Sequence, residues 1–133
     1  MLNITETVNT YLKTEISGLP TIYNDIFPVE TGDLIISRHD PSQSAVREFG
    51  DGTRYVEAQF SYYARCQKAG DAREWLEKIA KQLENEQLVR QADNVSFQSS
   101  VATLPQFIEV DDKGHTIYMM SVIISFLDGQ KRP

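Results

Sequence analysis

Residues 106–127 read QFIEVDDKGHTIYMMSVIISFL, and this stretch decides the fold. Two runs with alternating apolar side chains flank the sequence DDKG at 111–114, whose acidic residues and glycine are typical of a tight turn. One face of the second run, 115–127, is apolar throughout: Tyr118, Met120, Val122, Ile124 and Phe126. Because successive side chains of a strand point to opposite faces, we predict a long antiparallel hairpin that buries this face.

The opposite face of the 115–127 run is too apolar for a strand surface that meets only water. It mixes serines with large apolar side chains: Ile117, Met119, Ser121, Ile123 and Ser125. We expect either a helix or another subunit to cover it.

Working outward, residues 3–16 have the period of an amphipathic helix. Asn3 can cap its first turn, and Gly18 supplies a left-handed C-terminal stop. We expect its polar face to see water: Glu6, Asn9, Thr10 and Lys13.

A second helix is predicted from apolar residues at helical spacing: Ala72, Trp75, Leu76, Ile79, Ala80 and Leu83. Asp71 is expected to cap its first turn. We expect replacement of Trp75 by alanine to be among the most harmful core substitutions.

The remaining chain predicts strands separated by turns. Strands are expected at 34–37, 53–65 and 95–101, with a further start at 46–49 and a short extended piece around Ile22. In the 53–65 strand the even-numbered side chains belong inward. Turns are expected at 40–44 and 50–52, and Pro105 is expected to interrupt the strand pattern before 106–110 resumes it.

This order predicts an α+β fold, a mainly antiparallel sheet with two principal helices packed on one face. The length of 133 residues fits one domain spanning 1–133, with a flexible tail at 129–133.

The net charge of −6 argues against tight nucleic-acid binding, which needs a surplus of Lys and Arg. No apolar run is long enough to cross a membrane, and the N-terminus lacks the features of a signal peptide. The single cysteine agrees with a reducing compartment. We therefore expect the chain to stay in the cytoplasm in which it is made, with no membrane partner.

The sequence offers little that could carry a reaction. Cys66 and the two histidines, His39 and His115, could meet in space as a nucleophile and a base. The favoured interpretation is a small, semi-buried cysteine and two surface histidines beside turns. One cysteine and two distant histidines do not make a zinc site, and 50–52 is too short for a phosphate-binding loop. We predict no enzyme, no cofactor and no metal.

Several longer stretches resemble a known family. They are TVNTYLK at 7–13, RHDPS at 38–42, FSYYAR at 60–65, AREWLEKIA at 72–80, TLPQF at 103–107 and GHTIY at 114–118. Together they resemble the minor capsid proteins of tailed phages and prophages of Gram-positive bacteria. The resemblance implies a virion component similar to a tail terminator, a hexameric ring that caps the tail tube and docks to the head–tail connector. It brings no catalytic residues.

A ring needs a head-to-tail interface that closes by rotation. The two-sided apolar character of the last strand and the unpaired edges of a small sheet offer material for one. Six copies at −6 each carry about −36, so an acidic lumen would let DNA slide through without binding. The alternatives are another phage neck or minor capsid interaction protein, or a small ligand-binding α+β domain.

Interface residues are expected in two turns and on one strand. The polar 40–51 loop contributes Asp40, Ser42, Arg47 and Asp51, and the 111–114 hairpin tip contributes Asp112 and Lys113. Tyr63 is added because tyrosine is enriched at protein interfaces. The alternative is that both turns are simply solvated and that Tyr63 is a cross-strand partner.

Overall fold

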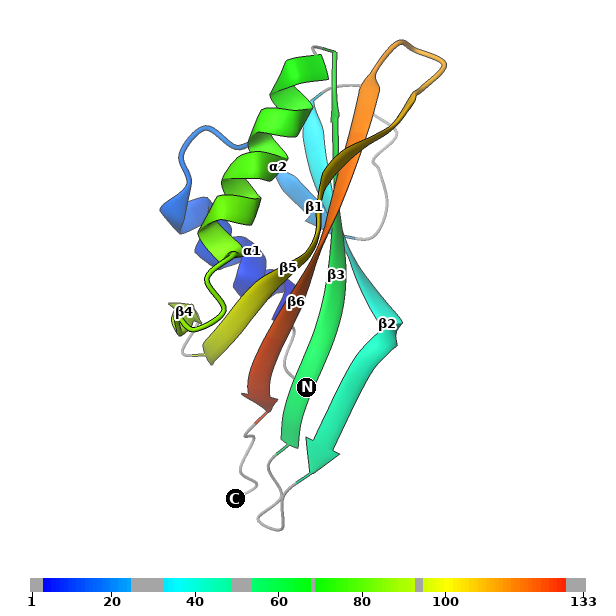
Figure 1. The fold of residues 1–133 in the computed structure, drawn as a ribbon. Helices are drawn as coiled ribbons and strands as arrows, with labels where there is room; N and C mark the ends of the chain where they lie inside the picture. Colours follow the sequence, from blue (N-terminus) through cyan, green and yellow to red (C-terminus); the bar gives the residue numbers. More distant parts are fainter. Residues whose placement is uncertain (1–3, 25–32, 49–53, 68, 93–94, 129–133) are drawn as a thin grey trace.

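The computed structural model describes residues 4–24, 33–48, 54–67, 69–92 and 95–128. It confirms the α+β fold: two helices pack on one face of a six-stranded, mostly antiparallel sheet (Figure 1). The elements are α1 (Ile4–Glu15), β1 (Ile22–Asn24), β2 (Leu34–Glu48), β3 (Arg54–Cys66), α2 (Ala69–Leu83), β4 (Arg90–Ala92), β5 (Val95–Val110) and β6 (Thr116–Asp128). The predicted turn at 50–52, the Asn3 cap and the 129–133 tail lie outside the described residues.

The strands follow one another across the sheet in the order β1-β2-β3-β6-β5-β4. Neighbours are antiparallel except β1, which runs parallel to β2 through three residue pairs. The long strands β3 and β6 therefore form the middle, and the two edges of the sheet belong to different parts of the chain. β1 corresponds to the extended piece expected around Ile22.

The predicted C-terminal hairpin is confirmed. β5 and β6 pair from Phe97 and Phe126 up to Val110 and Thr116, and Gly114 takes a left-handed φ of 82° in the turn between them. Met120, Val122 and Ile124 are fully buried on the helix side of β6. On β3 the even-numbered residues Ala58 to Cys66 also point inward, as expected.

The turn predicted at 40–44 is wrong. β2 runs without a break from Leu34 to Glu48, and its pairing with β3 shifts register between Asp40 and Ala45. A β-bulge absorbs the turn-forming residues, and Pro41 is tolerated because β2 is an edge strand beyond its short pairing with β1. The strand start expected at 46–49 is the far end of this same strand.

The break in alternation expected at Pro105 occurs as a register shift between Thr103 and Gln106, but the strand does not end there. β5 continues from Val95 to Val110, and three register shifts against β6 accommodate the proline and its neighbours. β4 pairs only with Val95, Ser96 and Phe97, so a proline at 105 removes no hydrogen bond between strands on that side.

Helix α2 confirms the predicted apolar stripe. Ala72, Leu76, Ile79 and Leu83 have no exposed surface, whereas Trp75 is only partly buried against the core. Trp75 is thus less central than predicted. Asp71 lies inside the first turn, where its charge favours the helix dipole, and not at the capping position in front of it.

The polar face predicted for α1 is partly wrong, because Asn9 is buried. Its Nδ2 donates to Ser37 Oγ at 3.2 Å, and the Tyr62 hydroxyl donates to its Oδ1 at 3.3 Å. A buried amide is tolerated only with such partners. The network therefore ties α1 to β2 and β3. Gly18, with φ of 84°, ends the helix segment as expected.

Burial of Tyr62 is expected to make the folded protein less stable as the pH rises into the alkaline range. Complete burial of its side chain raises the pKa of the phenol far above its ordinary value of 10.0. Above about pH 10 the unfolded chain loses this proton and the folded chain keeps it, so the free energy of unfolding falls with a slope approaching about 1.4 kcal/mol per pH unit.

Urea unfolding between pH 9 and 11 measures this slope, and Tyr62→Phe is the control because it removes the titrating group. We expect the variant to lose about 1 kcal/mol at neutral pH and to show a shallower alkaline decline. Equal slopes in the two proteins would contradict the assignment to Tyr62.

Candidate assembly surfaces

The helix-free face of the sheet consists of cross-strand rows. One row joins Arg38, Ser61, Ser121 and Thr103, and the row above it joins Ile36, Tyr63, Met119 and Gln106. Neither described helix covers this face (Figure 1). Of the two covers expected for the second face of the last strand, a helix or another subunit, the helix is therefore ruled out among the described elements. Part of it is already buried within the chain, since Ile36 and Ile117 are buried.

Exposed apolar side chains gather on the far half of β5. Leu104, Phe107 and Val110 are 69%, 54% and 55% exposed. Phe107 pairs with Tyr118 and Val110 with Thr116, residues of the helix side of β6, and the Phe107 and Tyr118 rings meet edge to face at 5.8 Å. Phe107 and Val110 therefore lie on the helix side of the sheet, and Leu104 lies there too because it faces α2 across a groove. We call these three side chains the apolar ridge.

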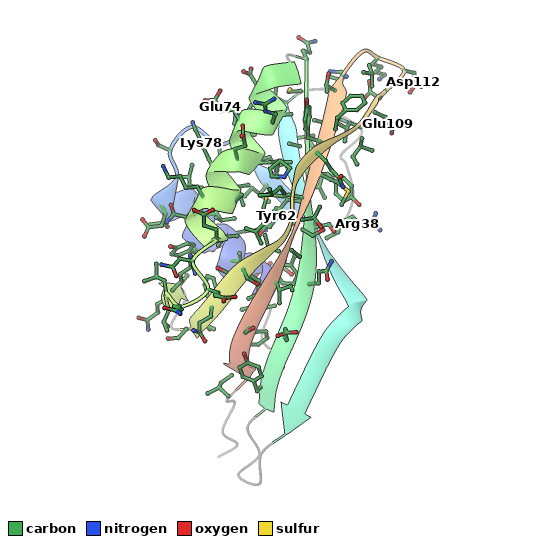
Figure 2. The ribbon with its side chains drawn as sticks, in the orientation of Figure 1. Arg38, Tyr62, Glu74, Lys78, Glu109 and Asp112 are labelled. Carbon is green, nitrogen blue, oxygen red and sulfur yellow. The ribbon has the colours of Figure 1, made fainter. Side chains whose placement is uncertain are left out.

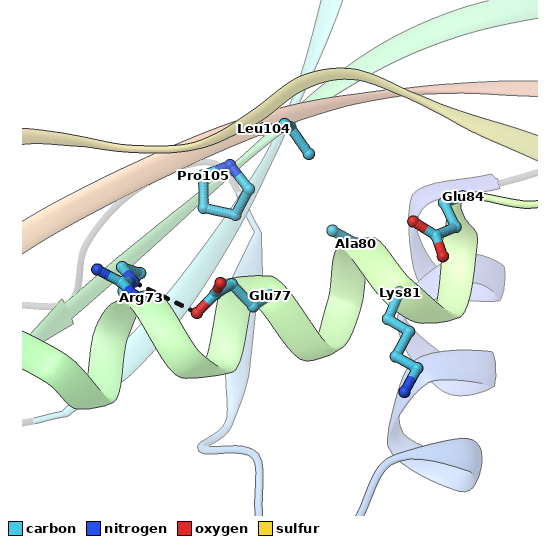
Figure 3. Close-up of a pocket in the computed structure, with 7 residues that line it drawn as sticks. All are labelled: Arg73, Glu77, Ala80, Lys81, Glu84, Leu104 and Pro105. Carbon is cyan, nitrogen blue, oxygen red and sulfur yellow. Dashed lines mark hydrogen bonds and ion pairs between the residues drawn. The ribbon is translucent and has the colours of Figure 1, made fainter.

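An open groove of about 590 Å³ separates this part of β5 from α2 (Figure 3). Its apolar surface comes from Ala80, Leu104 and Pro105. Its remaining lining residues are charged: Arg73, Glu77, Lys81 and Glu84. The Arg73 guanidinium pairs with the Glu77 carboxylate at 3.4 Å. Apolar contacts with a charged rim suit a protein segment better than a small polar substrate.

The hairpin tip is tightly built. The Asp111 carboxylate accepts the backbone N–H groups of His115 at 2.8 Å and Lys113 at 3.0 Å. These hydrogen bonds, that of His115 first, hold the pKa of Asp111 below its ordinary value of 3.8. Asp112 and Lys113 stand exposed at the end of a fixed loop, so the tip is a preformed projection.

The cysteine and histidine residues do not form a reaction centre in the described structure. Cys66 is fully buried in the core, and its Sγ accepts the Ala72 backbone N–H at 3.1 Å at the start of α2. His115 is buried, not on the surface as expected; its Nδ1 lies 3.4 Å from Asp111 Oδ1. His115 is thus a buried part of the hairpin turn, in contact with Asp111. The His39 side chain lies outside the described part.

The predicted interface residues fall in several places. Tyr63 is half-buried on the helix-free face between Ile36 and Met119, and Asp112 and Lys113 are at the hairpin tip. Three others lie on strand β2, not in a loop: Asp40, Ser42 and Arg47, whose side chains are outside the described part. Asp51 is also outside it. Their role at an interface stays a prediction.

The sequence did not indicate the β5 ridge or which strands would form the unpaired edges, because only the pairing of strands shows which backbone is left open. Within the described ranges, no three His, Cys, Asp or Glu side chains are grouped to hold a metal ion. None of the helices described there is long and apolar enough to span a membrane.

An α+β sheet whose described part leaves strand edges unpaired and an apolar ridge exposed has surfaces of the kind through which structural proteins bind other proteins. The chain matches the model of the bacteriophage tail terminator protein family over residues 11–128 and belongs to that family. Its role is therefore structural, in the phage tail or at its junction with the head. A comparison with curated proteins finds no significant match.

Proposed function

We propose that this chain forms a homo-oligomeric ring, a hexamer, that caps the tail tube and docks it to the head–tail connector. The observation that carries the proposal is the family match, which spans the end of α1 and all of α2 and the sheet. Assembly takes place in the host cytoplasm, and DNA passes through the lumen without binding tightly.

The geometry supports a ring in two ways. Among the described residues, β5 beyond its three pairs with β4 and β2 beyond its three pairs with β1 have no outer partner strand, so that one copy offers two different surfaces to its neighbours. The exposed apolar ridge on β5 is the kind of surface that monomers cover by association. A heterologous contact of this kind closes into a ring or continues as a filament.

The lumen is expected to be lined by the helix-free face. In its middle, that face carries partly exposed, uncharged polar side chains: Gln59, Ser61 and Ser125. Such side chains offer phosphates no cationic partner. The charged side chains described on the same face are of both signs, Arg38 and Arg65 with Glu57 and Glu109, so its lining is mixed where net charge alone predicts an acidic lumen.

Deletion of the coding sequence from the phage or prophage that carries it tests the proposal. We expect heads and tails to accumulate unjoined in electron micrographs, with infectious titre restored by the intact protein supplied in trans. Joined, infectious particles formed at an unchanged titre without this chain would contradict the proposal.

A further inference from the structure

We propose that neighbouring copies join edge to edge, with residues 106–110 of β5 in one copy beside the part of β2 that begins at Arg38 in the next. This inference rests on the proposed ring and names its interface. The contact is head to tail, because it uses opposite edges of the same sheet.

Both edges have open backbone in the described part of the chain. β4 covers only three residues of β5, Val95 to Phe97, and β1 covers only Ile35 to Ser37 of β2. Beyond these points each strand is paired on one side only. Unpaired edges are templates for association with another strand.

The directions of the two strands fit. β2, β3, β6 and β5 alternate in direction across the sheet, so β5 and β2 run oppositely. A neighbour related by rotation about an axis roughly along the strands would therefore present β2 antiparallel to β5, with the helix-free faces of both copies on the same side. Prolines at 105 and 41, which lack an N–H, limit the contact to a short window on each edge.

Charge complementarity specifies the pairing. Glu109 and Arg38 are both exposed and both on the helix-free face, since Glu109 pairs with Ile117 and Arg38 with Ser61. Figure 2 shows the two labelled side chains on the side of the sheet away from Glu74 and Lys78 of α2. Neither makes an ion pair within the described residues, whereas Lys78 pairs with Glu74 at 3.7 Å.

Within one copy Glu109 and Arg38 lie two cross-strand rows apart, with the Ile36–Tyr63–Met119–Gln106 row between them. If Glu109 of one copy meets Arg38 of the next, each copy must be shifted along the strand direction by these two rows relative to its neighbour. A stagger of this kind accompanies the strand tilt of closed barrels. The same contact brings a neighbour to the edge of the apolar ridge at Phe107 and Val110.

The occupant is a second copy because both halves of the complementary pair occur on this chain, acid on one edge and base on the other. A different partner would need only one of them. Capture of another protein at the β5 edge, with β2 left free, is therefore an outcome that overturns the inference.

Disulfide crosslinking tests the contact directly. The double variant Glu109→Cys/Arg38→Cys, oxidised in purified phage particles, is expected to give a ladder of crosslinked species up to six copies. Each single variant and the control Glu74→Cys/Arg38→Cys are expected to give no ladder, because Cys66 is buried and Glu74 faces away.

Charge reversal supplies a second readout. Glu109→Arg and Arg38→Glu alone are expected to reduce incorporation into particles about tenfold or more, because like charges then face one another. The double variant Glu109→Arg/Arg38→Glu is expected to restore it, and Glu74→Arg, the matched surface control, to leave it unchanged.

The outcomes separate the two proposals. Particles that contain a ring of this chain but show no Glu109–Arg38 crosslink, or that accept both single reversals, overturn the interface and leave the ring intact. Particles that lack the chain overturn the ring itself. A ladder together with rescue by the double reversal supports both.

Discussion

Replacement of Phe60 by alanine is expected to lower the free energy of unfolding by about 4 kcal/mol. Phe60 lies in the middle of β3, has no exposed surface, and is flanked by His39 on β2 and Val122 on β6. Truncation removes a large buried apolar group and leaves a cavity that the two neighbouring strands cannot close. Because a domain of this size has a stability of roughly 5–15 kcal/mol, the variant should still fold at low temperature.

Phe107→Ala is the matched control, since both phenylalanines are on long strands of the same sheet. Phe107 is more than half exposed and contacts Tyr118 edge to face, so its truncation should cost only about 1 kcal/mol. Urea unfolding of the two variants gives the comparison. Equal losses would show that the buried face of β3 has been assigned to the wrong side of the sheet.

Replacement of Arg90 by alanine is expected to cost about 3 kcal/mol, although this residue carries no predicted function. Arg90 is 3% exposed, and its guanidinium donates to the carbonyl oxygens of Gln82, Asn85 and Leu88 at 2.7 to 3.1 Å. These carbonyls end α2 and form the connection to β4. A cation at a helix C-terminus also interacts favourably with the helix dipole. The variant loses charge-assisted hydrogen bonds and the packing of the side-chain stem.

Arg90→Lys separates geometry from charge. Lysine keeps the positive charge but cannot spread donors over three carbonyl groups, so we expect about half of the loss. Chemical denaturation of the three proteins at one pH measures the series. If Arg90→Lys is as stable as the wild type, charge alone accounts for the interaction and the hydrogen-bond assignment is wrong.

The fold was largely predictable because its main elements have strong periodicity. The alternation in 53–65 and 115–127 and the helical stripe from Ala72 to Leu83 each fix which side is buried, and the structure agrees. Predictions failed where residues that favour a turn lie inside a strand that is held by pairing with its neighbour. The turn-forming residues at 40–44 and Pro105 are held in strands by long neighbours that continue the ladder on both sides of a bulge.

The burial of two polar residues was also not predicted from the sequence. Asn9 has the spacing of a surface residue on α1, and only its partners Ser37 and Tyr62, distant in sequence, explain its burial. Arg90 was missed for the same reason, because its acceptors are backbone carbonyls that no sequence pattern marks.

For the assembly surfaces, the sequence indicated the hairpin tip and the excess of apolar residues in the last strand. It did not indicate Glu109 or Arg38. Their proposed role follows from the strand pairing, which leaves part of β5 and part of β2 without an outer partner among the described residues and puts both side chains on one face. The sequence alone does not show on which face or edge of the sheet a charged residue lies; the strand order does.

The central claim is that this chain is a ring component of the phage tail where it meets the head. Cryo-electron microscopy of purified particles, with the focus on the head–tail junction, tests it most directly. We expect six copies of this α+β fold around the channel at the end of the tail tube, joined sheet edge to sheet edge. A junction resolved to side-chain detail in which this fold is absent would contradict it.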